Sequence, residues 1–182
     1  MKVEIITVLD NTNFGTYLQA LATSKAIISL GHNAEIIRYT RPSMTGVGQC
    51  FRLLKDRGVL SWLRNVWKIP GVLKLRNKDY NYLIRHAVVT DEYVGYDSLI
   101  ANPPIADVYL TGSDQVWNSI YNRGVDKSFY LEFAPIGKRR VAYAASIGMD
   151  SIPLNERVET VGLLKKYNSI TVRESAAKNL LQ

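Results

Sequence analysis

Residues 107–118, DVYLTGSDQVWN, join a short apolar segment to a polar loop. The first four residues favour a buried β-strand, and Gly112 allows the backbone to turn tightly or to approach a ligand closely. In an open α/β sheet, the loop beyond the carboxyl end of a strand is where ligands bind. The carboxylate of Asp114 and the amide of Asn118 could bind a ligand there, or they could simply satisfy the hydrogen bonds of a turn.

The N-terminal residues predict a β-strand, an α-helix and a second β-strand. Residues 3–9 are rich in β-branched side chains, apolar residues then recur at helical spacing from Tyr17, and Gly31 is a typical helix C-cap. Residues 34–39 form the second strand, and a parallel crossover is the simplest connection. Polar residues 10–16 therefore lie at the start of the first helix, where free N–H groups favour an anion. Alternatively, Asn13 or Thr12 only caps the helix.

Strand and helix patterns also alternate in the remainder of the chain. Extended segments are expected at residues 88–93, 107–110, 141–145 and 169–172, and helices at 96–101, 154–167 and from 173 onward. Residues 41–49 contain one proline and two glycines and are predicted to be a flexible loop. This order favours one α/β domain, a Rossmann-like three-layer fold with a mainly parallel sheet, over residues 1–182.

The composition is that of a globular protein with an excess of positive charge. The chain has 182 residues, of which 47% are hydrophobic and 21% charged, and its formal net charge is +7. This charge favours anionic partners without identifying one. A single cysteine, Cys50, excludes an internal disulfide. Because no signal peptide or apolar run of membrane-spanning length is recognised, we expect a cytoplasmic protein, peripheral at most at the inner face of the membrane.

A basic, amphipathic region, about residues 50–87, is predicted to form two or three helices as an insertion. Breaks are expected near Gly58 and at Pro70–Gly71. Its basic face could meet an anionic polymer or membrane headgroups. The favoured alternative is that these helices cover the sheet, with Trp62 and Trp67 packed inward. Specific nucleic-acid binding is not expected, because no recognition motif accompanies the charge.

Several polar loops are predicted to meet at one edge of the parallel sheet. Residues 13–15, 112–118, 146–148 and 173–174 each follow or flank a predicted strand end. The edge would then carry a carboxylate, Asp114, and a guanidinium, Arg173, which suits a small anionic molecule. Alternatively, Arg173 forms an intramolecular ion pair with Glu174 or Glu132.

These loops carry a resemblance to the polysaccharide pyruvyl transferase family. The similar segments are NFG at 13–15 followed by LQA at 18–20, GSDQVWN at 112–118, FYLEF at 129–133, AYAASIG at 142–148 and VRES at 172–175. They occur in the order and with the spacing of the family. The resemblance is to the N-terminal half of its members.

The resemblance implies a fold and an activity. Members resemble two-lobed glycosyltransferases of the B type, in which two Rossmann-like lobes face a cleft. They transfer pyruvate from phosphoenolpyruvate to paired sugar hydroxyls, which forms a ketal and releases phosphate. A cell-surface or exopolysaccharide acceptor is implied, with phosphoenolpyruvate as donor substrate and no cofactor. No metal site is predicted, because no His, Cys and Asp cluster has metal-ligand spacing, although a divalent ion could accompany the phosphate.

The resemblance also implies roles for residues of the sheet edge. Arg173 would hold the phosphoenolpyruvate anion, and Asp114 would orient a substrate hydroxyl or move a proton. The residues expected to line the substrate pocket are Asn13, Gly15, Gly112, Ser113, Gln115, Trp117, Asn118, Ser146 and Glu174. Trp117 offers a flat face for a sugar, but core packing explains a tryptophan equally well.

The family pattern continues into a second lobe that contributes a histidine, and we expect this lobe to be absent here. The two histidines, His32 and His86, belong to no family motif and are expected to have capping or surface roles. The chain therefore resembles an incomplete enzyme, inactive without a second lobe and prone to self-association through its lobe-facing surface. A lobe of a sugar-nucleotide glycosyltransferase and a non-catalytic domain that binds anionic polymers or membranes are the alternatives.

Overall fold

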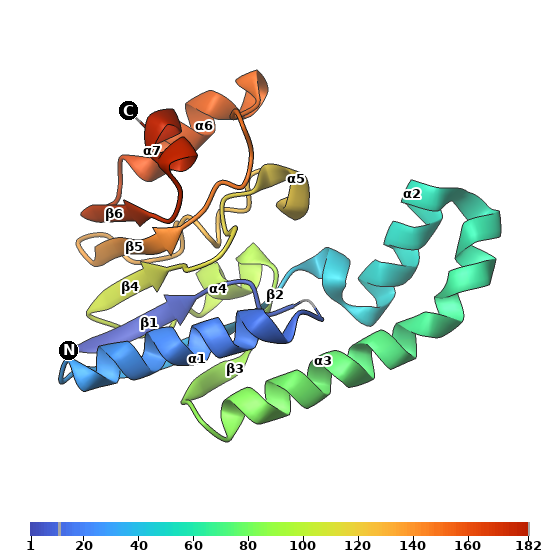
Figure 1. The fold of residues 1–182 in the computed structure, drawn as a ribbon, viewed down its shortest axis with the longest axis horizontal. Helices are drawn as coiled ribbons and strands as arrows, with labels where there is room; N and C mark the ends of the chain where they lie inside the picture. The colour runs from blue at the N-terminus through green and yellow to red at the C-terminus, as the bar shows by residue number, and fades with distance from the viewer. Residues whose placement is uncertain (11, 182) are drawn as a thin grey trace.

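A computed structural model describes residues 1–10 and 12–181; Asn11, in the predicted polar turn, and Gln182 lie outside the described residues. The described chain forms one parallel six-stranded sheet with the order β3-β2-β1-β4-β5-β6, which confirms the predicted α/β, Rossmann-like class (Figure 1). The strands are β1 (Lys2–Ile6), β2 (Asn33–Thr40), β3 (Val89–Val94), β4 (Val108–Thr111), β5 (Arg139–Ala145) and β6 (Ser169–Val172).

Helices connect these strands as a parallel sheet requires. The α-helices are α1 (Phe14–Ser29), α2 (Gly46–Asn65), α3 (Ile69–Ile84), α4 (Tyr96–Ala101), α5 (Ser119–Asn122), α6 (Leu154–Leu164) and α7 (Ser175–Leu181). Two short 3₁₀ helices, η1 (Pro42–Met44) and η2 (Val66–Lys68), flank α2.

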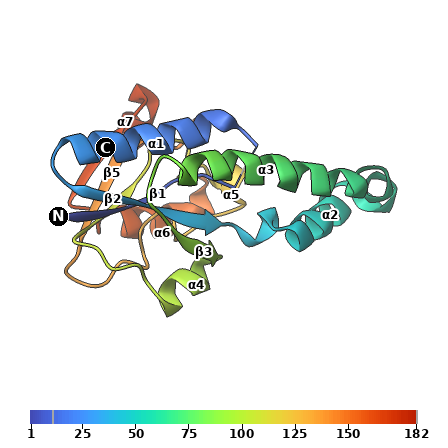
Figure 2. The same ribbon diagram turned by 90° about the horizontal axis from the view of Figure 1, so that it is seen from below.

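Alternating side chains of β1 divide the core into two layers. Val3 and Ile5 pack under α1 and the last turns of α3, where Tyr17 and Leu83 are buried. Ile6 points to the opposite layer. That layer is built from α4, α6 and the segment 125–134, which includes buried Phe129, Tyr130 and Leu131. Figure 2 shows the helices on both faces of the sheet. This two-sided burial explains why the central strands are nearly continuous apolar runs.

The strand order places a topological switch point between β1 and β4. Strands β1, β2 and β3 follow one another toward one side of the sheet, whereas β4, β5 and β6 follow one another toward the other side. The loops after β1 and β4 therefore diverge at their carboxyl ends and leave a crevice, which is where open α/β sheets bind ligands.

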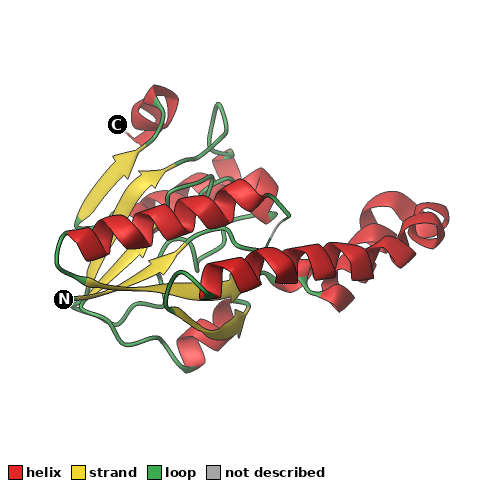
Figure 3. Ribbon diagram, turned by 60° about the horizontal axis from the view of Figure 1, so that its bottom comes forward, coloured by secondary structure: helices red, strands yellow, loops and turns green. Residues whose placement is uncertain are grey.

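The structure corrects two predictions about residues 41–87. Residues 41–49 are not a flexible loop: Pro42 begins η1, and the Thr45 side chain accepts a hydrogen bond from the Gly48 amide at 3.0 Å to cap α2. The basic helices were expected to cover the sheet with Trp67 packed inward. Instead, only the last turns of α3 pack against the sheet, and the rest of α2 and α3 forms a hairpin that extends beyond it (Figure 3). Trp67 is exposed. Gly58 does break the helix as predicted, with φ 73°.

No helix in the described part of the chain has the length and hydrophobicity that crossing a membrane requires.

Candidate functional site

The loops that follow β4, β5 and β6 lie side by side at the carboxyl edge of the sheet. Asp114 forms an isolated parallel β-bridge with Ala145. The Ser146 amide donates a hydrogen bond to the Asp114 carbonyl oxygen at 2.9 Å. The Arg173 amide donates to the Ala145 carbonyl oxygen at 3.1 Å. The structure thus brings together three of the four predicted loop segments, because β4, β5 and β6 are neighbours in the sheet.

Backbone geometry at Gly112 and Asp114 shapes the first loop. Gly112 has φ 103°, and a Cβ atom there would lie 2.3 Å from the Tyr143 carbonyl oxygen. Only glycine therefore fits at this position. The Thr7 hydroxyl donates to the Ser113 carbonyl oxygen at 2.7 Å, and Oδ1 of Asp114 accepts from the Gln115 amide at 2.7 Å. Asp114 itself has φ 111°, a strained conformation for a residue with a side chain.

The Asn118 side chain is buried and fully engaged within the protein. Its Nδ2 donates to Gln115 Oε1 at 3.0 Å and to the Gly148 carbonyl oxygen at 3.1 Å. Its Oδ1 accepts from the Tyr121 amide at 3.0 Å and caps α5. Asn118 therefore holds two strand-end loops together, which matches the alternative that it serves a turn.

Trp117 occupies the core beneath the loop. Its ring is buried, stacks on Tyr130 at 5.6 Å between ring centroids, and meets Tyr167 edge-on. The indole Nε1 donates to the Phe129 carbonyl oxygen at 3.2 Å. This position corresponds to core packing, the second of the two interpretations of this residue, because the faces of the ring are covered by protein.

Arg173, Glu174 and Ser146 form a connected polar group beside the loop. The Ser146 hydroxyl donates to Glu174 Oε1 at 2.6 Å, and Arg173 Nη2 lies 3.4 Å from the same oxygen. Arg173 is thus paired with Glu174, one of the two partners considered from sequence, whereas Glu132 pairs with Lys166. A long ion pair between half-exposed side chains contributes little free energy, so the Arg173 guanidinium can turn to another anion.

Asn13 caps the first helix. Its Oδ1 accepts from the Gly15 amide at 3.0 Å, and its carbonyl oxygen accepts from the Thr16 amide at 3.1 Å. The geometry matches the capping alternative. Neighbouring Thr12 lines a separate cleft.

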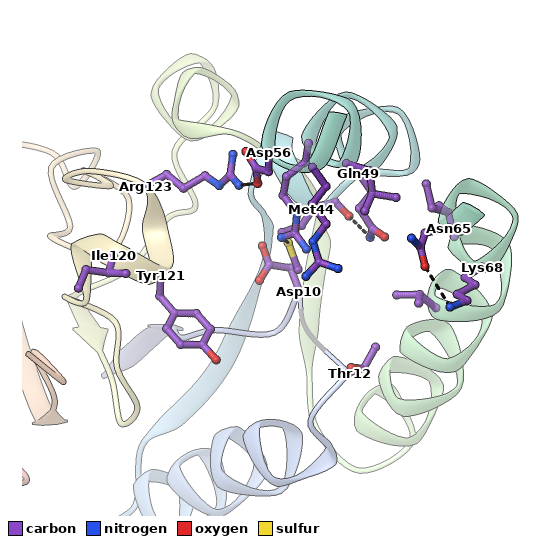
Figure 4. Close-up of a pocket in the computed structure, with 15 residues that line it drawn as sticks. Asp10, Thr12, Met44, Gln49, Asp56, Asn65, Lys68, Ile120, Tyr121 and Arg123 are labelled. Atoms are coloured by element: carbon purple, nitrogen blue, oxygen red, sulfur yellow. Dashed lines mark hydrogen bonds and ion pairs between the residues drawn. The ribbon is translucent and has the colours of Figure 1, made fainter. Parts of the chain in front are cut away.

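This cleft, of about 670 Å³, lies at the carboxyl ends of β1 and β2 between α5 and the α2–α3 hairpin (Figure 4). Its lining residues are Asp10, Thr12, Met44, Gln49, Arg52, Leu53, Asp56, Arg57, Asn65, Lys68, Ile69, Val72, Ile120, Tyr121 and Arg123. None of the site residues predicted from sequence lines it. Arg123 forms an ion pair with Asp56 that links α5 to the hairpin across the cleft.

A buried ion pair joins Asp10, which lines the cleft, to Arg41. Arg41 Nε and Nη2 donate to the two carboxylate oxygens of Asp10 at 2.9 and 2.7 Å. Its Nη1 donates to Asn122 Oδ1 at 2.7 Å and to the Tyr121 carbonyl oxygen at 3.3 Å. Burial alone would lower the pKa of Arg41, but the hydrogen bonds and charge of Asp10 outweigh it and raise the pKa above its ordinary value.

The sequence contains a signal for this pair, although neither residue is among the site residues predicted from it. Asp10 is the first charged residue after β1, and Arg41 directly follows β2. Since β1 and β2 are parallel neighbours, residues just past their carboxyl ends lie close together. The first charged residue after each predicted strand is therefore a candidate for this edge of the sheet.

Among the described residues, no group of three or more His, Cys, Asp and Glu side chains is arranged to hold a metal ion.

Comparison with known proteins gives a family. A family model described as "Polysaccharide pyruvyl transferase" matches residues 13–182, nearly the whole chain. No curated protein and no solved structure matches the chain. The matched range contains the three neighbouring loops of the carboxyl edge and the α2–α3 hairpin. The chain therefore belongs to the polysaccharide pyruvyl transferase family.

Proposed function

We propose that this chain is the donor-side lobe of an enzyme that transfers pyruvate from phosphoenolpyruvate to sugar hydroxyls of a cell-surface or exopolysaccharide. The observation that supports this most directly is the exposed Arg173 guanidinium, 3.4 Å from Glu174, which is hydrogen-bonded to Ser146 beside the Asp114 loop. A loosely held guanidinium at the carboxyl edge suits the phosphate or carboxylate of the donor. A second lobe would complete the site, so transfer is expected to require it.

The reaction needs proton transfer and stabilisation of negative charge. The terminal carbon of the donor gains a proton, C2 becomes electron-poor, and a sugar hydroxyl attacks it and loses its proton. A second hydroxyl of the sugar forms the other C–O bond as the C2–O bond to phosphate breaks. One hydroxyl proton balances the proton on carbon, and the other leaves with phosphate. A carboxylate close to C2 could accept such a proton.

Asp114 is suited to the role of this proton-accepting carboxylate. Oδ1 is fixed by the Gln115 amide at 2.7 Å, and Oδ2 accepts no hydrogen bond from the described residues. The carboxylate is half-buried on the rim, so its orientation is set without loss of access. We assign it to orient an acceptor hydroxyl or to take its proton. Ser146 would act indirectly, by holding Glu174 through its 2.6 Å hydrogen bond.

Calorimetric titration with phosphoenolpyruvate tests the assignment of Arg173. Arg173→Ala should weaken binding at least about tenfold, since it removes a charge-assisted contact. The matched control is Arg139→Ala, an exposed arginine at the start of β5 and thus at the opposite edge of the sheet. Equal affinities in wild type and Arg173→Ala would contradict the assignment.

Thermal-shift measurements separate this function from that of a sugar-nucleotide glycosyltransferase lobe. A ligand stabilises the native state only if it binds that state. We expect phosphoenolpyruvate, and not a nucleotide sugar, to raise the melting temperature; the reverse result would favour the glycosyltransferase. Self-association through a lobe-facing surface stays a prediction, to be measured by sedimentation.

A further inference from the structure

The net positive charge of the protein is confined to the α2–α3 hairpin. We call residues 46–85, from the start of α2 to the C-cap of α3, the arm. The arm has nine Lys and Arg residues and two Asp residues, a net charge of +7 that equals that of the whole chain. The remaining residues have 14 basic and 14 acidic side chains and are formally neutral. The charge is therefore a local feature of the arm, outside the sheet and its rim.

The end of the arm presents an apolar surface to solvent. We call Val59, Leu60, Leu63 and Trp67 the tip face. Leu60 is 80% exposed and Trp67 70% exposed, although both are large apolar side chains. Positions 60, 63 and 67 share one side of a helix, and the intervening Trp62 and Val66 are half-buried on the other side. The outward direction of this stripe exposes side chains that a sheet-covering helix would bury.

Basic side chains border the tip face. Arg64 and Lys68 follow Leu60 at intervals of four residues and so lie beside the apolar stripe. Among the described residues, no acidic side chain forms an ion pair with Arg57 or Arg64. The end of the arm thus combines exposed aromatic and aliphatic groups with unneutralised cations.

The arm is positioned to reach a surface at a distance from the sheet. It departs from the sheet beside α1, and its far end contains the Gly58 kink and η2 (Figures 1 and 2). Gly58 has φ 73°, and no atom lies within 4 Å of where its Cβ would be. The turn is therefore open to solvent, and nothing in the described chain covers the tip face.

We propose that the arm docks on an anionic lipid membrane, with the tip face inserted at the boundary between headgroups and acyl chains. Apolar side chains flanked by Lys and Arg are the combination that binds such surfaces, since hydrocarbon is buried while cations meet acidic headgroups. An acidic polysaccharide would leave Leu60 and Trp67 in water. A second copy would bring together two arms of charge +7, which repel each other. This inference is independent of pyruvyl transfer.

Docking would also orient the cleft. Arg57 and Lys68 belong to both the arm end and the cleft lining. A membrane bound at the tip face would therefore lie next to one wall of the cleft, within reach of a substrate held at the headgroup layer.

Vesicle co-sedimentation tests the proposal directly. The purified chain should bind vesicles of phosphatidylcholine containing about one third phosphatidylglycerol, and not vesicles of phosphatidylcholine alone. Binding should weaken strongly between about 0.1 M and about 1 M salt, as the Debye length falls from ~10 to ~3 Å. The double variant Arg57→Gln/Arg64→Gln should bind about 25-fold more weakly, roughly fivefold for each charge.

A matched pair of apolar variants isolates the tip face. Leu60→Ser/Trp67→Ser should lower the affinity for anionic vesicles about tenfold or more. The control is Leu154→Ser/Val158→Ser on α6, where the side chains are 84% and 85% exposed; it should bind like wild type. Circular dichroism would verify that each variant folds. Equal losses in both pairs, or no loss at Leu60 and Trp67, would overturn the proposal.

Fluorescence provides a readout of insertion. Brominated lipids should quench the emission of the Trp62→Phe variant, which retains Trp67 and Trp117. Adding Trp67→Phe should remove most of this quenching while vesicle binding persists, because the remaining Trp117 is buried in the core. Two results would refute insertion: quenching that persists in Trp62→Phe/Trp67→Phe, or a dimer in sedimentation that Leu60→Ser/Trp67→Ser converts to monomer.

Discussion

Replacing Arg41 by methionine should destabilise the protein substantially. Arg41 and Asp10 are both almost fully buried, and methionine would fill much of the same space without the charge. The substitution removes two hydrogen bonds to the Asp10 carboxylate and the two that tie α5 to the end of β2. Among the described residues, Asp10 would keep only the hydrogen bond from the residue 41 amide, at 2.9 Å.

The expected cost follows from the carboxylate that remains. Four hydrogen bonds to charged groups, at about 1.5–3 kcal/mol each, would sum to about 6–12 kcal/mol, but such contributions are not additive. Removing one partner of a buried ion pair costs about 3–5 kcal/mol, because the other charge stays buried without compensation. We expect a loss in this range, a large part of the roughly 5–15 kcal/mol that stabilises a domain.

Urea unfolding followed by circular dichroism measures this loss. An unchanged slope m of free energy against urea concentration would show that wild type and variant unfold in the same way. Lys127→Met is the control: its pair with Glu159 spans 3.2 Å but is about half exposed, so its loss should cost under about 1 kcal/mol. The double variant Asp10→Asn/Arg41→Met should lose about 2 kcal/mol less stability than the sum of the losses in the two single variants. If Arg41→Met cost no more than Lys127→Met, the interpretation of the pair as a structural lock would be refuted.

Two further predictions concern other parts of the structure. Burial raises the pKa of Glu4 to about 8. Between about pH 4.5 and 8 the native state therefore holds a proton that the unfolded state lacks. The free energy of unfolding falls as the pH rises through this range, by up to about 1.4 kcal/mol per pH unit. Glu4→Gln should therefore gain stability relative to wild type from pH 5 to pH 8 in urea unfolding; a constant difference would contradict this. Gly148→Ala should cost about 1–3 kcal/mol of stability, because the new Cβ atom would lie 2.7 Å from Gln115 Cδ. The control is Gly31→Ala, which has φ 83° but no neighbour within 4 Å, and it should cost about 1 kcal/mol. Similar losses at both glycines would show that space beside Gln115 is not limiting.

The fold was largely predictable because strand patterns report burial on both faces of a sheet. Each predicted strand is present, and the polar loops after β4, β5 and β6 meet as expected. The order of the strands was not predictable, since local patterns carry no information on which strands pair. The Asp10–Arg41 pair depends on that order: the residues are 31 positions apart and meet only because β1 and β2 are neighbours.

The arm shows a second limit of sequence patterns. Helical periodicity indicates that a helix has an apolar side, but the same pattern arises whether that side meets a sheet, another helix or an external partner. Here the left-handed geometry at Gly58 and the short η2 redirect the chain, so Trp67 is exposed although Trp62 is half-buried. The two residues were expected to behave alike, and only the backbone path separates them.

Residues of the segments at 112–118 and 172–175, which resemble the family, divide into two physical classes. Asn118 and Trp117 have their polar atoms committed to other parts of the chain, and Gly112 is fixed by its contact with β5. Asp114 and Arg173 retain binding capacity, because one carboxylate oxygen and a loosely paired guanidinium still face the rim. The first class builds the edge of the sheet, and the second comprises the residues that we propose act on a substrate. Substitutions in the first class should therefore lower stability and activity together, whereas substitutions of Asp114 and Arg173 should lower ligand binding or activity with little change in stability.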